Sequence, residues 1–456
     1  MRRVLHDLAF VGFLAALFGM GFRKPFLFVL TYVYIDVVST QRLTYILLNS
    51  VPISLIAVGL AVVSWAAIDD KSDVRVAPRQ GMILLLLAYC WYTTVNADFR
   101  LEAQDKWEWV WKALAFAAFL PLTLRTKLRI ESLLLFMILS AASIIIVGGI
   151  KTLASGGGGY GELNLMVTNN SGLYEGSTIS MVAIAIIPLI LWFARFGTVF
   201  PPDWKVRVFA GALIFACLLI PIGTSTRTGL LCIVLLATLM LRDTKRKFVY
   251  LGALGAMALV AIPFLPSAFT ERMGTIKTYQ GDASASTRLA VWAWTIDYVK
   301  THPMGGGFEA YRQNRIHYDL KQVDANGNTV TVQSSPEVDQ ARAYHSAYFE
   351  MLGEQGYFGL GLWLLINLAG LFRMEVLRHR YRRAEGDQAW IAPLASALQN
   401  AHLIYMLGAA FVAIAFQPFI YMLIGAQIGL DTYCARKRSE TQWRPIQRRK
   451  PAAAEA

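Results

Sequence analysis

Long apolar stretches separated by short polar connectors are the main pattern of this chain. Residues 54–67, 206–222 and 248–265 are almost uniformly apolar, and a helix needs about 17–25 such residues to cross a bilayer. A soluble protein would interrupt runs of this kind with polar positions on its outward faces. The pattern predicts an all-α polytopic membrane protein with about 12–13 transmembrane helices and one large polar loop that contains short helices. We expect the spans at residues 5–22, 25–40, 46–68, 81–97, 108–124, 132–151, 176–195, 206–222, 227–241, 247–265, 345–372, 394–415 and 418–434.

Basic residues in the connectors predict how the spans are oriented. The positive-inside rule places clusters of lysine and arginine in the cytoplasm. Clusters occur in connectors 71–79, 125–129, 195–207, 242–247 and 373–383 and in the tail from residue 436. From the third span onward this orientation is consistent, and it puts residues 96–106, 151–175, 223–227 and 266–344 on the opposite side.

The first two apolar segments do not fit this orientation if both cross the membrane. The basic residues at 2–3 and at 23–24 cannot then both be cytoplasmic. One of the two segments is therefore a candidate re-entrant helix. The chain divides into N-terminal transmembrane helices, a loop with an amphipathic helix, C-terminal transmembrane helices and a basic cytoplasmic tail, at residues 1–265, 266–344, 345–434 and 435–456.

Composition and charge agree with a membrane protein. Of 456 residues, 56% are hydrophobic and 16% are charged, whereas soluble domains carry about 25% charged residues. The net charge is +13, but the basic residues lie in connectors and the tail, so this charge does not indicate nucleic acid as a partner. The four cysteines lie in or beside apolar segments without a CxxC pair, which predicts small buried side chains and no disulfide framework.

The polar loop 266–344 contains one clear helical pattern. In residues 286–301, Leu289, Trp292, Ile296 and Val299 form an apolar stripe at helical spacing. This stripe predicts a helix that lies on the membrane surface.

Two segments follow that helix in the loop. Gly305, Gly306 and Gly307 allow a close approach of backbone to a partner. Residues 323–338 are polar with turn signals and predict a local excursion away from the site.

Three ionisable residues stand at or near the ends of apolar segments: Arg227, Arg288 and His345. Charge near hydrocarbon is unfavourable and is usually retained for function. If their segments emerge on one side of the membrane, they can converge on one anionic substrate, because arginine forks match phosphate oxygens. Structural readings stay open for each: an interfacial arginine at 227, a solvated helix face at 288 and a capping or buried histidine at 345.

Further polar candidates are less distinctive. Arg272 follows Glu271 and either pairs with it or contacts substrate. Asn169 and Asn170 either hydrogen-bond sugar hydroxyls or form a capping and turn cluster. Glu354 lies two turns below His345. The six histidines are isolated, and no HExxH or DxD motif appears, so we expect neither a metal site nor a cofactor.

Three segments together carry a family resemblance. GTSTRTG, ERMGTIKTYQGDASASTRLAVWAWTIDYVKTHPMGGGFEAY and HSAYFEMLGEQGYFGL occur in this order. They resemble the O-antigen ligase and polymerase superfamily, and most of all its exosortase A-associated putative O-glycosylation ligase branch. The likeness runs from the RKPF sequence near Arg23 to the last spans, and many relatives have asparagine where this chain has Ser346.

The resemblance implies a metal-independent membrane glycosyltransferase of the bacterial inner membrane with its site on the periplasmic side. The implied substrates are an undecaprenyl diphosphate-linked glycan and an acceptor protein or lipid. Arg227 and Arg288 would hold the diphosphate, and His345 would be the catalytic base. From the residues themselves we also predict substrate contacts at Arg272, Gly305, Gly306, Gly307, Glu354, Asn169 and Asn170. Nearby arginines would help to keep the histidine neutral.

Two other functions stay open. A polymerase of the same superfamily needs the same diphosphate clamp and base. A lipid-linked glycan transporter belongs to another class, and transporters typically show internal repeats and charges at the membrane midplane. Here no convincing repeat is visible, and the charges cluster at one interface. The sequence therefore favours the ligase.

Overall fold

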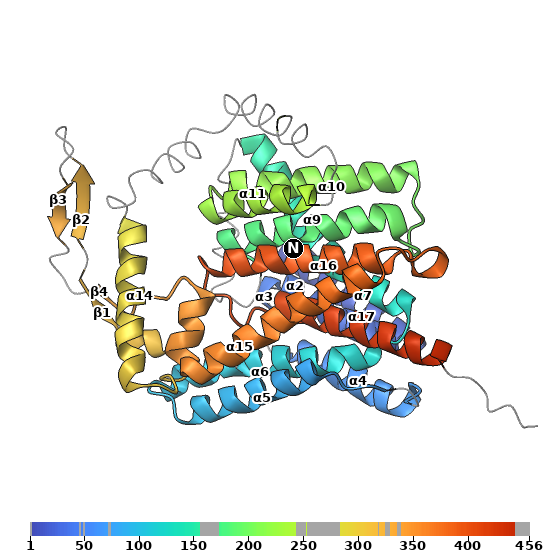
Figure 1. Ribbon diagram of the computed structural model, residues 1–456, viewed down its shortest axis with the longest axis horizontal. Coiled ribbons are helices and arrows are strands. Elements are labelled where there is room, and N and C mark those ends of the chain that lie inside the picture. Colours follow the sequence, from blue (N-terminus) through green and yellow to red (C-terminus); the bar gives the residue numbers. More distant parts are fainter. Residues whose placement is uncertain are drawn as a thin grey trace, which may run out of the picture.

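A computed structural model describes residues 2–44, 47–48, 51–71, 74–155, 173–242, 252, 283–317, 319–323, 329–334 and 339–442. Most of these residues form long helices that run side by side in one bundle (Figure 1). The helices are α1 (Arg2–Gly21), α2 (Phe26–Val38), α3 (Thr40–Leu43), α4 (Ile53–Ile68), α5 (Pro78–Val95), α6 (Arg100–Thr123), α7 (Lys127–Ser155), α9 (Gly176–Phe196), α10 (Trp204–Gly223), α11 (Arg227–Leu241), α14 (Ala283–Thr301), α15 (Ala347–Arg380), α16 (Ile391–Ala409) and α17 (Pro418–Gln442).

The all-α polytopic fold predicted from the sequence is confirmed. Every predicted span within the described residues overlaps a helix, although the span expected at 394–415 runs past the end of α16 at Ala409. The span expected at 247–265 lies outside the described residues, apart from residue 252. Four of the described helices, namely α7, α9, α10 and α15, are long and apolar enough to cross a membrane by length and composition. Helices α4 and α11 are apolar but shorter.

The short length of helix α2 bears on why the first two apolar segments do not both fit the predicted orientation. It has only 13 residues, which corresponds to a length of about 20 Å, whereas the hydrocarbon core is about 30 Å thick. Most of its side chains are buried against neighbouring helices. Helix α2 is therefore the better candidate for the segment that does not cross the bilayer fully.

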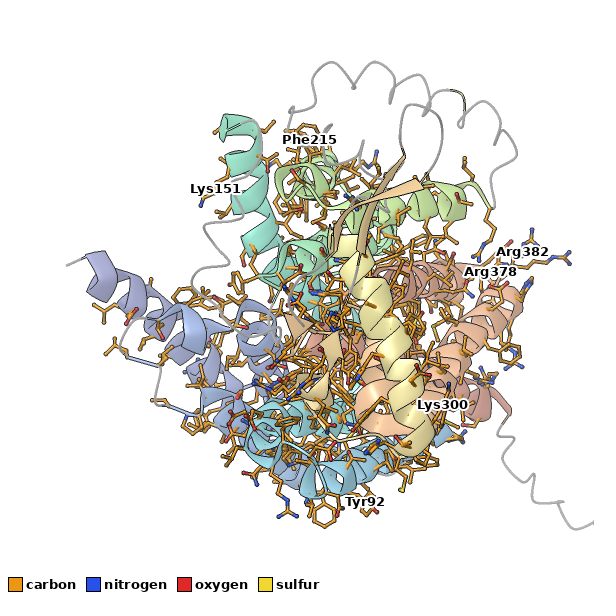
Figure 2. The ribbon with its side chains drawn as sticks, turned by 90° about the vertical axis from the view of Figure 1, so that its left-hand side faces the viewer. Tyr92, Lys151, Phe215, Lys300, Arg378 and Arg382 are labelled. Atoms are coloured by element: carbon orange, nitrogen blue, oxygen red, sulfur yellow. The ribbon has the colours of Figure 1, made fainter. Side chains whose placement is uncertain are left out.

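Helix α14 lies across one end of the bundle (Figure 1). Figure 2 looks onto this end, with Lys300 labelled near the C-terminal end of α14. The helix predicted at 286–301 is thus present. Its apolar stripe is divided, because Val299 is buried whereas Leu289 and Ile296 are exposed. That this exposed apolar surface lies on the membrane stays a prediction.

The chain after α14 forms a 3-10 helix and two short antiparallel ladders. Helix η3 (Ala310–Gln313) precedes β1 (Arg315–Ile316), which pairs with β4 (Asp339–Gln340). Between them, β2 (Asp319–Val323) and β3 (Thr329–Ser334) form a hairpin in which Asp319 is opposite Ser334. The hairpin projects away from the bundle (Figure 1). Of the excursion predicted at 323–338, this hairpin contains the described residues 323 and 329–334.

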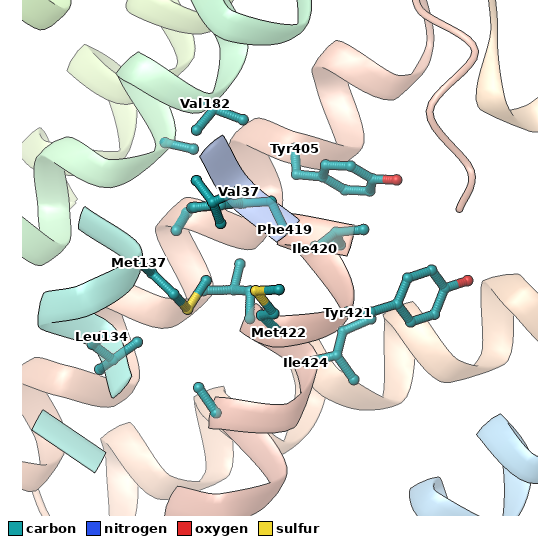
Figure 3. Packing of buried hydrophobic residues seen from close by; sticks show 14 of the residues in the cluster. Val37, Leu134, Met137, Val182, Tyr405, Phe419, Ile420, Tyr421, Met422 and Ile424 are labelled. Atoms are coloured by element: carbon teal, nitrogen blue, oxygen red, sulfur yellow. The ribbon is translucent and has the colours of Figure 1, made fainter. Parts of the chain in front are cut away.

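The core lies between the long helices. Val37, Leu134, Met137, Val182 and Tyr405 come from α2, α7, α9 and α16 and pack around the start of α17 (Figure 3). Small residues let helices approach closely. A Cβ atom on Gly425 would lie 2.7 Å from Leu120 Cδ2, so glycine there lets α17 pack against α6 without moving this leucine. This packing fixes the bundle whose end carries the polar segments.

Candidate active site

The segments that carry Arg227, Arg288 and His345 meet at one end of the bundle. The α10–α11 turn touches the start of α9, because a Cβ atom on Gly176 would lie 3.4 Å from Thr224 Cβ. Glu175, which precedes Gly176, acts electrostatically on His345, and so does Arg288. Segments far apart in sequence therefore lie near one another at this end, and their action on one substrate stays a prediction.

His345 stands two residues before the start of α15, between two buried neighbours, Tyr344 and Ser346. Its own side chain keeps solvent-exposed surface. Asn314 holds the preceding segment, because its side-chain oxygen accepts from the Arg342 N–H at 2.9 Å and its backbone oxygen accepts from the Ala341 N–H at 3.1 Å. The chain on both sides of His345 is therefore fixed while the imidazole stays accessible.

Trp292 joins α14 to the residues around His345. Its indole N–H donates to the Tyr344 carbonyl at 2.8 Å. Its ring stacks on Phe349, with centroids 4.8 Å apart and 5° between the planes. Arg288 lies one turn earlier on the same helix and is half-buried. Trp292 thus sets the position of Arg288 relative to His345.

The electrostatic environment favours the neutral form of His345. Burial lowers the pKa of its imidazole, the positive charge of Arg288 lowers it further, and Arg342 acts in the same direction. The carboxylate of Glu175 opposes these effects, but the net pKa is lowered. A neutral imidazole with accessible surface can accept a proton from a hydroxyl group near pH 7.

Arg227 is the first residue of α11 and is half-buried. The turn before it is held by hydroxyl groups. Thr226 Oγ1 donates to Ser180 Oγ at 2.9 Å, and Thr224 Oγ1 lies 2.8 Å from the same oxygen. Gly229 must be small, because a Cβ atom there would lie 2.6 Å from Pro221 Cβ. The hydroxyls and glycines of GTSTRTG therefore build the turn that presents Arg227.

Strained backbone gathers at the same end of the molecule. Five non-glycine residues among those that the structure describes have a positive φ. Four of them are Ser225, Glu309, Ala341 and His345, and the φ of His345 is 48°. Such conformations are unfavourable by about 1–3 kcal/mol each and cluster at functional sites. Ser225 lies in the turn before Arg227, and Ala341 and His345 lie in the segment before α15.

The glycine triplet makes the close approach that was expected of it, and its partner is the protein itself. Gly306 N–H donates to Gly353 O at 3.1 Å, and Gly307 N–H donates to Glu354 O at 3.0 Å. Gly305 and Gly307 have φ of 82° and 77°, which suit glycine. The contact is made at a kink in α15, where Gly356 has φ 64° and ψ −166°. The triplet therefore connects the loop to α15.

Glu354 is fully buried and is engaged by protein groups. Lys106 Nζ lies 2.8 Å from each of its carboxylate oxygens, and the Glu309 N–H donates to Oε1 at 3.0 Å. Lys106 also binds Glu350 at 2.7 Å. These contacts join α6 to α15, and a contact of Glu354 with substrate stays a prediction.

Three of the candidate site residues lie outside the described residues, namely Arg272, Asn169 and Asn170. Lys106 was not singled out from the sequence, although it is a lysine amid aromatic residues on a helical pattern. Among the residues that the structure describes, no group of three or more histidine, cysteine, aspartate or glutamate side chains is placed to hold a metal ion.

Comparison with known families gives the class of this protein. Residues 212–364 match the family described as O-antigen ligase, and residues 5–198 match a family of unknown function. No curated protein matches the chain. The O-antigen ligase match contains Arg227, Arg288 and His345. The fold is that of a multi-pass membrane protein, and the match supports a glycan-transferring activity of the glycosyltransferase type. Residues 212–364 are thus similar to the O-antigen ligase family.

Proposed function

We propose that this protein is a glycan ligase of the exosortase-associated O-glycosylation branch. It transfers an oligosaccharide or polysaccharide from undecaprenyl diphosphate to an acceptor hydroxyl on the periplasmic side of the bacterial inner membrane. The observation that supports this most is the meeting of His345 with Arg288, next to the turn that presents Arg227. A diphosphate clamp beside a neutral base is the minimum set for such a transfer.

The proposed reaction is a single displacement. Arg227 and Arg288 hold the diphosphate and stabilise the charge that develops on the leaving oxygen. His345 takes the proton of the acceptor hydroxyl, whose oxygen forms a bond to the anomeric carbon. The bond between that carbon and the diphosphate oxygen breaks, and undecaprenyl diphosphate leaves. The configuration at the anomeric carbon is inverted.

The course of α15 supports the proposed orientation. Helix α15 is kinked at Gly356, and the part after the kink, residues 357–380, is 24 residues long, or about 36 Å. This length exceeds the hydrocarbon thickness of about 30 Å. Arg378 and Arg380 end the helix, and Figure 2 shows Arg378 and Arg382 near each other. The positive-inside rule puts this basic end in the cytoplasm and the His345 end in the periplasm.

Reconstitution tests the proposed function. The purified protein is placed in liposomes with an undecaprenyl diphosphate-linked glycan and with candidate protein and lipid acceptors. We expect the glycan to move to an acceptor other than the carrier-linked glycan. Extension of one carrier-linked glycan by another would instead identify a polymerase, and movement of the intact lipid across the bilayer without any transfer would identify a transporter.

Orientation has its own test. A reporter fused near Asn326, between β2 and β3, should be active only when it is exported. Cytoplasmic activity of this fusion would contradict the proposed periplasmic site.

A further inference from the structure

A cavity of about 670 Å³ opens at the same end of the bundle as His345. It lies between α6, the η3 segment, the start of α15 and the segment that joins α16 to α17. Ala343 and Tyr344, the two residues before His345, belong to its wall. Its volume falls within the range of about 300–1,000 Å³ that is usual for ligand pockets. No step of the proposed reaction described above involves this cavity.

The walls of this cavity are acidic. Six carboxylates line it against three basic side chains. Two of the basic side chains are already paired: Lys106 with the carboxylates of α15, and Arg312 with Glu309 at 3.1 Å. The remaining carboxylates lie on the first turns of α6, at Glu102, Asp105 and Glu108. An excess of negative charge therefore faces the cavity from α6.

The charge of the cavity is opposite to that of the arginine side of the site. The positive charges of Arg288 and Arg342 lie close enough to His345 to lower its pKa. Arg227 lies at the start of α11, on the adjoining turn. A cleft lined by one sign of charge attracts the opposite sign and repels its own. The anionic diphosphate is thus drawn to the arginines and kept out of the cavity, which leaves the cavity for the other substrate.

The walls of the cavity also carry aromatic side chains, among them Tyr344, which is 1% exposed. Trp109 and Tyr311 add aromatic surface to the same walls, and such surface packs against peptide groups and aliphatic side chains.

We propose that this cavity is the acceptor subsite and that it selects a phosphate-free, cationic acceptor, namely a polypeptide segment whose glycosylated hydroxyl is flanked by lysine or arginine. This inference rests on the proposed glycan transfer. Glu102, Asp105 and Glu108 recognise the basic side chains of the acceptor. The same carboxylates reject a second diphosphate-linked glycan and a phosphorylated glycolipid.

Direct binding tests the inference separately from catalysis. The full-length protein is placed in phosphatidylcholine nanodiscs, so that the lipid does not attract cationic peptides. Two fluorescent serine-containing peptides are compared, one with lysine and one with glutamate on both sides of the serine. We expect the lysine peptide to bind about tenfold more tightly at low salt, which is the effect of two or three partly exposed charge pairs.

Substitutions in α6 locate the binding site. The triple variant Glu102→Gln, Asp105→Asn, Glu108→Gln should abolish the difference between the two peptides, and Glu102→Lys with Asp105→Lys should reverse it. A reversed preference cannot come from misfolding. The matched control is Asp297→Asn, which removes an exposed carboxylate of α14 outside the cavity and should keep the tenfold preference.

The outcomes separate the two proposals. Equal binding of both peptides by the unaltered protein, or a preference that the α6 variants leave unchanged, overturns the acceptor subsite even where transfer occurs. Transfer to a phosphorylated glycolipid as efficient as transfer to the lysine peptide overturns it as well. Charge-selective peptide binding at α6 without glycan transfer to any acceptor supports the subsite and overturns the proposed function.

Discussion

Replacement of Trp292 should uncouple the two halves of the proposed site. This side chain links α14, which carries Arg288, to the segment that carries His345. Trp292→Phe keeps an aromatic ring against Phe349 but removes the N–H that donates to the Tyr344 carbonyl at 2.8 Å. Trp292→Ala removes both contacts.

The contacts give the size of the expected effect. A typical hydrogen bond contributes about 0.5–1.5 kcal/mol, and an aromatic pair contributes about 0.5–1.5 kcal/mol beyond its burial of area. If this free energy holds Arg288 in place for the transition state, transfer should fall about two- to twelvefold in Trp292→Phe. It should fall about five- to 150-fold in Trp292→Ala, where both contributions are lost.

The assay measures transfer at saturating carrier, membrane abundance and the pH dependence of the rate. In Trp292→Ala, Arg288 no longer lowers the pKa of His345 as strongly, so the acid limb of the profile should move to higher pH. The matched control is Trp294→Phe, because the ring of Trp294 stacks on Tyr298 of the same helix, with centroids 4.8 Å apart, and phenylalanine keeps an aromatic ring there. Normal transfer by abundant Trp292→Ala, or an equal loss in Trp294→Phe, would refute the positioning role.

Three further predictions concern charge. Arg288→Gln should raise the pKa of His345 and move the acid limb of the transfer rate to higher pH, whereas Glu175→Gln should lower this pKa and move the limb to lower pH; shifts in the same direction would contradict the electrostatic account. Lys106→Met leaves two buried carboxylates without their cation and should destabilise the protein by about 3–5 kcal/mol in thermal unfolding. Lys112→Met, whose cation lies near an aromatic ring on the same helix, should lose about 1 kcal/mol or less. Transfer should survive EDTA, and a loss that magnesium or manganese restores would reveal a metal requirement.

The bundle could be predicted from the sequence because its signal is local. Each long apolar run, such as residues 206–222, specifies a helix by length and hydropathy alone. The amphipathic pattern at 286–301 specified α14 in the same way. Only the short α2 could not be resolved, because an apolar run buried in protein and one that crosses lipid have the same composition.

The contacts within the site could not be predicted, because they join residues far apart in the chain. Lys106 meets Glu350 and Glu354 across 244 and 248 residues, and residues 96–106 were read as a loop although α6 begins at Arg100. The contact of the glycine triplet with α15 could not be predicted either. It is made at a kink in this helix, whereas the sequence pattern predicts one uninterrupted span. Nothing local indicates that it is kinked at Gly356.

The most direct test of the account measures carrier binding, glycan transfer and membrane abundance for the same three variants. His345→Ala should bind the undecaprenyl diphosphate-linked glycan nearly as the unaltered protein does and lose transfer about a hundredfold or more. Arg227→Ala and Arg288→Ala should weaken carrier binding, and lysine at either position should restore it poorly, because a point charge does not replace the bidentate fork. Near-normal transfer by abundant His345→Ala would contradict the central claim that His345 is the base of this site.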